Sequence, residues 1–307
     1  MSAASTDALC TQSYRERLPE PALTRLLACV WVQQVSADGP AYEHRTVPNG
    51  CIEFACVKGA EHAYVIGPRR TASIDCCPAG TTVVGVRFRP GVSAAVLGAT
   101  APEIVDLTVG LEDLWGRAAT GVAERIAVAA TVEEAAQTLE WEIVARCAGA
   151  PGLDAAVAEM VTRLQPWQPG GVTELASAMY ISPRQLRRRC IAALGYGPKA
   201  LHRILRFQGF LALTQAFHGR DVGLGWLAAA AGYCDQAHLT HECIALTGLT
   251  PTEFLHETRA GCGPNHDHAV SFAGPRRALV RTRVASLDEL RRANVADSCK
   301  SLARVRA

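Results

Sequence analysis

The sequence is poor in aromatic residues and lacks long apolar runs. Only 6% of its 307 residues are aromatic, so a core must rest largely on Ala, Val and Leu. No stretch reaches about 18 uninterrupted apolar residues, and we therefore expect no membrane-spanning helix and no membrane partner. The first thirty residues carry charges such as Arg15 and Glu20 and lack an apolar signal segment, which predicts a cytoplasmic protein.

Motifs for catalysis are missing as well. The sequence has no Gly-rich phosphate loop, no G-x-S-x-G nucleophile elbow and no H-E-x-x-H zinc motif. We therefore expect a protein that is not an enzyme and holds no cofactor. The 12 cysteines, in a chain without a visible export signal, indicate reduced thiols rather than a disulfide framework.

The charge, by contrast, is distributed unevenly along the chain. Residues 1–165 hold 13 basic and 19 acidic side chains, residues 166–260 hold 9 and 6, and residues 261–307 hold 9 and 4. An acidic first half joined to a basic second half suggests a module for a small or neutral ligand followed by one for a polyanion. The length itself favours two domains.

The first half predicts a small antiparallel β domain followed by helices, in an α+β protein. Short runs rich in β-branched residues alternate with Gly-Pro and Asn-Gly turn signals between residues 23 and 90. The expected strands are Cys29–Val32, Cys51–Val57, Ala63–Ile66 and Thr82–Phe88. Residues 92–147 have helical spacing, and the Ala-Gly-Ala-Pro-Gly segment at 148–152 predicts a linker that ends a first domain at residue 150.

The second half contains an internal repeat with an offset of 53 residues. Matching pairs include Ala176 and Ala229, Tyr180 and Tyr233, Leu186 and Leu239, Cys190 and Cys243, Gly195 and Gly248, and Pro198 and Pro251. Similarity at a fixed offset indicates a duplicated supersecondary unit. We therefore expect two copies of one small structure in residues 151–260.

Each copy predicts a helix-turn-helix unit. In the first, a short helix near 172–179 precedes a second helix that Ser182 caps and Gly195 ends. In the second, Asp235 and Gly248 occupy the corresponding positions. The segment 198–217 predicts a connecting helix about 30 Å long, close to the roughly 34 Å between successive major-groove faces on one side of B-DNA.

Helical spacing also predicts which side chains face outward. In the first copy Leu186 and Cys190 lie on the core side, and the outer face carries Arg184, Arg187 and Arg188. Guanidinium groups pair with guanine or with phosphate, although a solvated basic face is the alternative. The outer face of the second copy carries Gln236, Ala237, Thr240 and His241, and it has far less charge.

These motifs resemble the DNA-binding domain of the AraC/XylS family of bacterial transcription regulators. The segments that carry the resemblance are Ser182–Arg189, Gly195–Pro198, Ala231–His241 and Gly248–Phe254. The resemblance implies a transcription factor that binds double-stranded promoter DNA and contacts RNA polymerase. It places the DNA contacts on the seven outward residues named above.

Three segments of the first half resemble an N-terminal domain found in one branch of such regulators. They are Pro48–Phe54, Gly85–Gly91 and Asp113–Gly116. The resemblance implies that this domain senses an effector or forms a homodimer. Arg87 and Arg89 lie two apart in a strand near Glu53, a pattern able to hold an anionic group of an effector. A surface pair or an internal salt bridge with Glu53 is the alternative. The helix expected over 133–147 serves dimerisation or packs on the sheet.

Two further functions stay open. A thiol- or metal-sensing regulator would use Cys51, Cys56, Cys76 or Cys77. A DNA-repair methyl acceptor fused to the same DNA-binding domain would need a compact zinc-bound cysteine cluster, and the cysteine spacings do not supply one. We expect the residues after 260 to form a mostly flexible basic tail that adds salt-sensitive DNA affinity.

Overall fold

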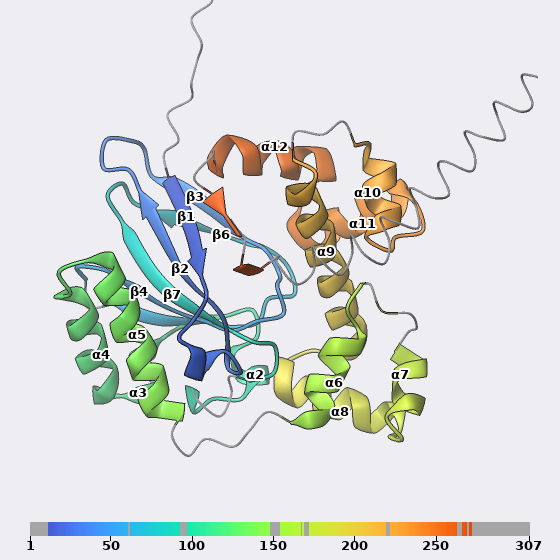
Figure 1. The fold of residues 1–307 in the computed structure, drawn as a ribbon, viewed down its shortest axis with the longest axis horizontal. Helices are drawn as coiled ribbons and strands as arrows, with labels where there is room; N and C mark the ends of the chain where they lie inside the picture. The colour runs from blue at the N-terminus through green and yellow to red at the C-terminus, as the bar shows by residue number, and fades with distance from the viewer. Residues whose placement is uncertain are drawn as a thin grey trace, which may run out of the picture.

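The computed structural model has the predicted α+β architecture, with a β domain first and a helical domain after it (Figure 1). It describes residues 12–60, 62–92, 97–147, 154–166, 168, 172–218, 222–262, 266–268 and 270–271. The predicted linker at 148–152 lies outside the described residues, as do residues 272–307.

The N-terminal domain is built on a seven-stranded sheet with the order β8-β5-β4-β7-β2-β1-β9. Its strands are β1 (Gln12–Arg17), β2 (Leu27–Val35), β4 (Glu53–Val57), β5 (Ala63–Ile66), β7 (Thr82–Phe88), β8 (Thr108–Gly110) and β9 (His266–Asp267). Neighbouring strands are antiparallel, except that β9 pairs with β1 in parallel. The four expected strands are confirmed, and two of them have the expected bounds.

A separate hairpin-like pair, β3 (Tyr42–Thr46) and β6 (Ser73–Cys77), lies beside this sheet. The sequence did not predict β1, β3, β6 or β8. The strands β1 and β3 are mostly polar, β8 has three residues, and β3 and β6 keep no fully buried side chain, so hydrophobic alternation gives no signal there.

Helices cover one face of the sheet (Figure 1). They are α2 (Ala101–Ile104), α3 (Leu111–Trp115), α4 (Arg117–Ala127) and α5 (Val132–Cys147), and a short 3-10 helix occupies Pro21–Leu23. Leu139 and Ile143 of α5 are buried in one core with Phe54 and Val86 of the sheet, which confirms that α5 packs on the sheet. Trp141 lies on the opposite side of α5 and is 68% exposed.

The C-terminal domain consists of two equivalent helical units joined by one long helix (Figure 1). Its helices are α6 (Ala155–Arg163), α7 (Val172–Ala178), α8 (Pro183–Leu194), α9 (Pro198–Ala216), α10 (Leu224–Ala230), α11 (Gln236–Thr247) and α12 (Pro251–Cys262). The bounds of α8 and α11 differ by the predicted offset of 53 residues. Leu186 and Cys190 and their counterparts Leu239 and Cys243 are buried in a shared core.

Part of the segment expected to be a flexible tail is folded. The helix α12 continues to Cys262, and β9 then pairs with the edge strand β1. Ser271 donates its backbone N–H to Glu16 Oε2 at 2.8 Å. The unpaired backbone N–H and C=O groups of the edge strand β1 bind this segment. Such long-range pairing is not visible in the local composition.

Candidate nucleic-acid interface and interdomain cavity

The helix α8 begins with a capping box. Ser182 Oγ accepts the backbone N–H of Gln185 at 3.2 Å, and Gln185 Oε1 accepts the N–H of Ser182 at 2.9 Å. Pro183 takes the first helical position, where its missing N–H costs nothing. Gly195 ends the helix in the left-handed conformation at φ 78°. These local signals fix where α8 begins and ends, and the buried Leu186, Cys190 and Leu194 fix which face points toward the core.

The three predicted arginines share that outer face. Arg184, Arg187 and Arg188 are exposed and line one shallow hollow on the surface. Among the residues that the structure describes, no carboxylate pairs with any of the three, whereas the neighbouring Arg189 is paired with Asp154 at 3.1 Å. Their positive charge is therefore available to a partner.

The outer face of α11 has the same placement and a different chemistry. Asp235 caps the helix, because its Oδ1 accepts the N–H of His238 at 2.7 Å. Gln236, Ala237 and His241 are exposed. Thr240 is half-buried and donates its hydroxyl to the backbone oxygen of Gln236 at 2.9 Å, which leaves an acceptor on its oxygen. This face can exchange hydrogen bonds, but it adds little charge.

The turns of the two units differ by one residue. The helix α7 ends at Ala178 and α10 at Ala230, 52 positions apart rather than 53. In the second unit Gly232 adopts a left-handed φ of 86°, whereas in the first unit Tyr180 does so at φ 54°. Tyr180 is 96% exposed, so the sequence comparison, which matched it to a buried tyrosine, missed an exposed ring next to the α8 face.

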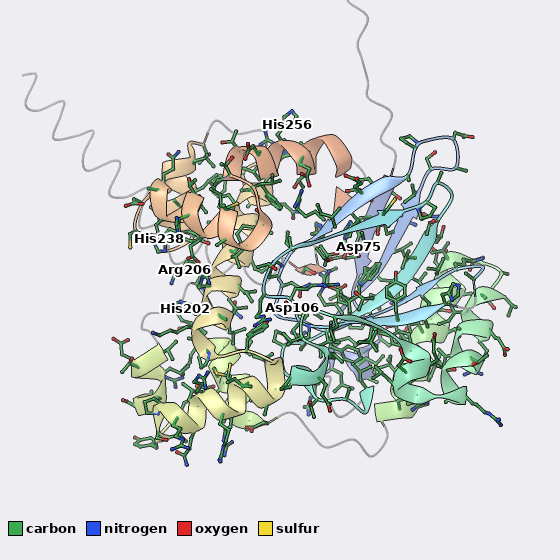
Figure 2. The ribbon with its side chains drawn as sticks, turned by 180° about the vertical axis from the view of Figure 1, so that it is seen from behind. Asp75, Asp106, His202, Arg206, His238 and His256 are labelled. Carbon is green, nitrogen blue, oxygen red and sulfur yellow. The ribbon has the colours of Figure 1, made fainter. Side chains whose placement is uncertain are left out.

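Tyr233, which the offset of 53 aligns with Tyr180, occupies the place of Ile181 in the structure and is part of the core. Tyr233 is buried, and the His238 ring meets it edge-on with centroids 5.3 Å apart. The guanidinium of Arg206 lies over the same ring at 5.4 Å, a cation–π contact between α9 and the second unit. Figure 2 shows Arg206, His202 and His238 along one side of the helical domain.

The N-terminal domain contacts the C-terminal ends of both recognition-helix candidates, α8 and α11. At α8, Gly195 lies so close to α2 that an added Cβ would be 2.9 Å from Val105 Cβ. At α11, the N–H of Ala72 donates to the backbone oxygen of Leu246 at 2.7 Å. The first contact is apolar and the second is polar.

Arg45 of β3 strengthens the second contact. Its guanidinium donates to both carboxylate oxygens of Glu257 on α12, at 2.6 and 3.0 Å. It also donates to the backbone oxygen of Thr247, the last residue of α11, at 2.9 Å. A single side chain thus joins the β3–β6 pair to the end of α11 and to α12.

A cavity of about 420 Å³ lies between the two domains. The sheet face opposite α4 and α5, the β3–β6 pair, and the helices α9 and α12 all line it. Of the three predicted effector residues, Glu53 and Arg87 line this cavity. Arg89 does not, and its Nε donates to the backbone oxygen of Thr24 at 2.7 Å. The structure therefore brings two of these residues together and separates the third.

Arg87 is held in a buried network at the cavity floor. Its Nε donates to Glu53 Oε1 and its Nη1 to Glu16 Oε1, both at 2.9 Å. Burial alone would lower the pKa of Arg87, but the adjacent carboxylates raise it well above its ordinary value. Burial alone would likewise raise the pKa of Glu16, but the hydrogen bond to His268 and the Arg87 charge lower it far below its ordinary value. The internal salt bridge with Glu53 is thus present, and Glu16 joins it.

The candidate sensor cysteines fall into two groups. Cys51 and Cys56 are buried, and burial raises the pKa of each thiol to about 12. Cys76 and Cys77 of β6 line the cavity, and burial raises the pKa of Cys77 as well. In the described part of the chain no group of three or more metal-binding side chains is clustered. High thiol pKa values disfavour the reactive thiolate at Cys51 and Cys56.

None of the described helices is both long enough and apolar enough to span a bilayer.

Two family models match separate parts of the chain. Residues 15–110 match a domain of unknown function (DUF6597), and residues 175–257 match a helix-turn-helix domain. The second match covers both helical units and the helix that joins them. No curated protein matches the sequence.

Solved structures of ToxT from Vibrio cholerae are similar in fold. The apo K231A variant has 10% sequence identity and a TM-score of 0.45, over 78% of this chain and 99% of that chain. Wild-type ToxT bound to an unsaturated fatty acid has 10% identity and a TM-score of 0.42, over 80% of this chain and 95% of that chain.

Proposed function

We propose that residues 175–257, which match a helix-turn-helix domain, form the AraC-type DNA-binding domain of a transcription regulator and read two successive major-groove segments of one promoter with α8 and α11. The observation that carries this proposal is the pair of equivalent helices with exposed outer faces that α9 joins. The helix α8 ends just before α9, and α11 packs along its side, where Arg203 pairs with Glu242 at 2.7 Å. A helix of 19 residues spans about 28 Å. That span is close to the helical repeat of B-DNA.

In this proposal the two recognition helices have different tasks. Arg184, Arg187 and Arg188 pair with phosphates or with the O6 and N7 of guanine, and they supply most of the binding free energy. Gln236, with Thr240 and His241, exchanges hydrogen bonds with base edges, and Ala237 allows close approach to a thymine methyl group. The second helix therefore contributes discrimination more than affinity.

We propose further that the N-terminal domain, residues 1–150, controls residues 151–260 through the interdomain cavity. An effector bound there touches strand β3 and helix α12, which Arg45 and Glu257 join. Arg45 also binds the last turn of α11, so a shift of β3 changes the position of the second recognition helix. Glu53 and Arg87 form the cavity floor.

A separate apolar surface, the exposed Trp141 on α5, is the one that we assign to a homodimer.

Selection from a random duplex pool tests the DNA-binding proposal. The enriched duplexes are then measured by fluorescence anisotropy at about 150 mM salt with excess random competitor, because affinities at low salt are dominated by nonspecific contacts. We expect enriched sites with two conserved segments whose centres are about 10–10.5 bp apart. Enrichment of one segment alone, or of none, would contradict reading by two helices.

A further inference from the structure

We propose that the interdomain cavity binds an organic cation with an apolar body that contains a ring. The regulatory consequence of this binding rests on the proposed function. The binding itself does not, because it can be measured on the chain without DNA. The rings and the charges that line the cavity favour this ligand class.

The cavity is rich in rings although the chain is poor in them. Tyr14, Trp31, Tyr42, Tyr64 and Phe254 line it, which is five of the 18 aromatic residues in the sequence. Its volume of about 420 Å³ lies within the range of small-molecule sites. Aromatic faces carry partial negative charge and attract cations. The lining therefore favours a ligand with an apolar body and a positive group.

Both arginines of the cavity are already neutralised. Arg87 is paired with Glu16 and with Glu53, so that its single charge meets two carboxylates. Arg45 is paired through two hydrogen bonds with Glu257. An anionic ligand would have to displace a buried carboxylate from Arg87, which would leave that carboxylate unpaired. The cavity is thus poorly suited to a carboxylate or phosphate ligand.

Two further acidic side chains leave the cavity with surplus negative charge. Glu43 of β3 and Asp75 of β6 line the rim and are exposed. Asp75 Oδ2 accepts the hydroxyls of Ser73 and Thr46 at 3.3 and 3.5 Å, and neither donor is charged. Asp75 of β6 lies on the side of the N-terminal domain that faces α9 and α12 (Figure 2). Attraction by these carboxylates favours a cation at the cavity mouth.

Three probes with one scaffold and different charges test the inference. Isothermal titration calorimetry on the full chain without DNA compares 4-phenylbutyl-trimethylammonium, 4-phenylbutanol and 4-phenylbutyrate. We expect the ammonium probe to bind about tenfold more tightly than the alcohol, and the carboxylate to bind least. Equal or tighter binding of the alcohol or the carboxylate, or no binding of the ammonium, overturns the proposal. DNA binding is not part of this measurement. A failure of the ligand proposal is therefore distinguishable from a failure of the proposed function.

Charge-removing variants locate the binding site. The double variant Glu43→Gln, Asp75→Asn should lower the affinity for the ammonium probe about three- to tenfold and leave the alcohol unchanged. Both side chains are exposed, so the variant should fold as the parent chain does. The matched control is Glu112→Gln, Glu124→Gln, which removes two exposed carboxylates from α3 and α4, outside the cavity. An equal loss in both double variants would mean general electrostatics and would overturn the assignment to this cavity.

Discussion

The two helix-turn-helix units share their scaffold and differ in what they present to DNA. Each has a side-chain cap at the start of its second helix, a left-handed glycine at the end, and a buried Leu and Cys between. At the offset of 53, Arg184, Arg187 and Arg188 correspond to Ala237, Thr240 and His241. The features that build the helix are the same in both units, whereas the outward side chains are not. The difference teaches that the fold and the contact chemistry of such a unit are specified by separate residues.

The units also differ in how the N-terminal domain holds them. The end of α8 packs against α2 through van der Waals contact at Gly195. The end of α11 is held by hydrogen bonds from Ala72 and Arg45. A tight apolar contact fixes position, whereas the polar contacts at α11 can exchange with water on the side of the Glu257 carboxylate, which is partly exposed. The second unit is therefore the one that we expect an effector to move.

The largest expected effect comes from removing the charge of α8. The triple variant with alanine at Arg184, Arg187 and Arg188 should lose about 3–9 kcal/mol of DNA-binding free energy, because each arginine that reads a base contributes about 1–3 kcal/mol. The matched variant Thr240→Ala, His241→Ala should lose less total affinity than the triple variant. It should lose more of the preference for the selected site over competitor. Anisotropy titrations measure both. Comparable losses in the two variants would remove the proposed division of tasks.

The next effect separates the two helix ends. Gly248 also has a left-handed φ, of 80°, but an added Cβ there meets nothing within 4 Å. Gly248→Ala should therefore cost only the backbone strain, about 1 kcal/mol. Gly195→Ala adds a Cβ 3.0 Å from the backbone oxygen of Ala101 and should cost about 2–4 kcal/mol. Urea unfolding gives both values, and equal destabilisation would show that α2 does not press on α8.

A smaller effect concerns the ion pair at α11. Arg45→Ala removes a guanidinium that is 17% exposed from a carboxylate that is 46% exposed. With solvent screening considered, we expect the free energy of unfolding to fall by about 1–2 kcal/mol and the preference for the selected DNA site to weaken. Arg189→Ala is the control, because its pair with Asp154 is exposed on both sides and should cost less than about 1 kcal/mol. A stable variant with unchanged site preference would argue against control through Arg45.

The smallest effect tests the turns. Tyr180→Asn replaces an exposed residue in the left-handed region by one that tolerates this conformation better. It should stabilise the fold, raising the free energy of unfolding by about 0.5–1 kcal/mol. Tyr233→Asn in the second unit should instead destabilise strongly, because that ring is buried against His238. Thermal unfolding distinguishes the two. Destabilisation by Tyr180→Asn would mean that this ring packs against something in solution.

Local signals in the sequence predicted the repeat, the caps and the outward arginines, because caps and helical spacing depend on near neighbours only. The strands β5 and β7 were predictable for the same reason. The β3–β6 pair was not, since its residues are half-exposed and polar. Arg45 and the cavity escaped prediction because Arg45 and Glu257 are 212 positions apart in the chain. The exposure of Tyr180 escaped it because α7 and α10 are 52 positions apart rather than 53, so that Tyr180 corresponds to Gly232 and not to Tyr233.

The dependence of DNA affinity on salt tests the division of tasks most directly. The slope of log Kd against log salt is measured on one selected duplex for the parent chain, for the α8 triple-alanine variant, and for a variant with alanine at Gln236, Thr240 and His241. Each phosphate contact contributes close to one unit of slope. We predict that the α8 variant lowers the slope by about 1–3 units while the α11 variant leaves it unchanged. An unchanged slope in the α8 variant, or an equal decrease in both, would contradict the account.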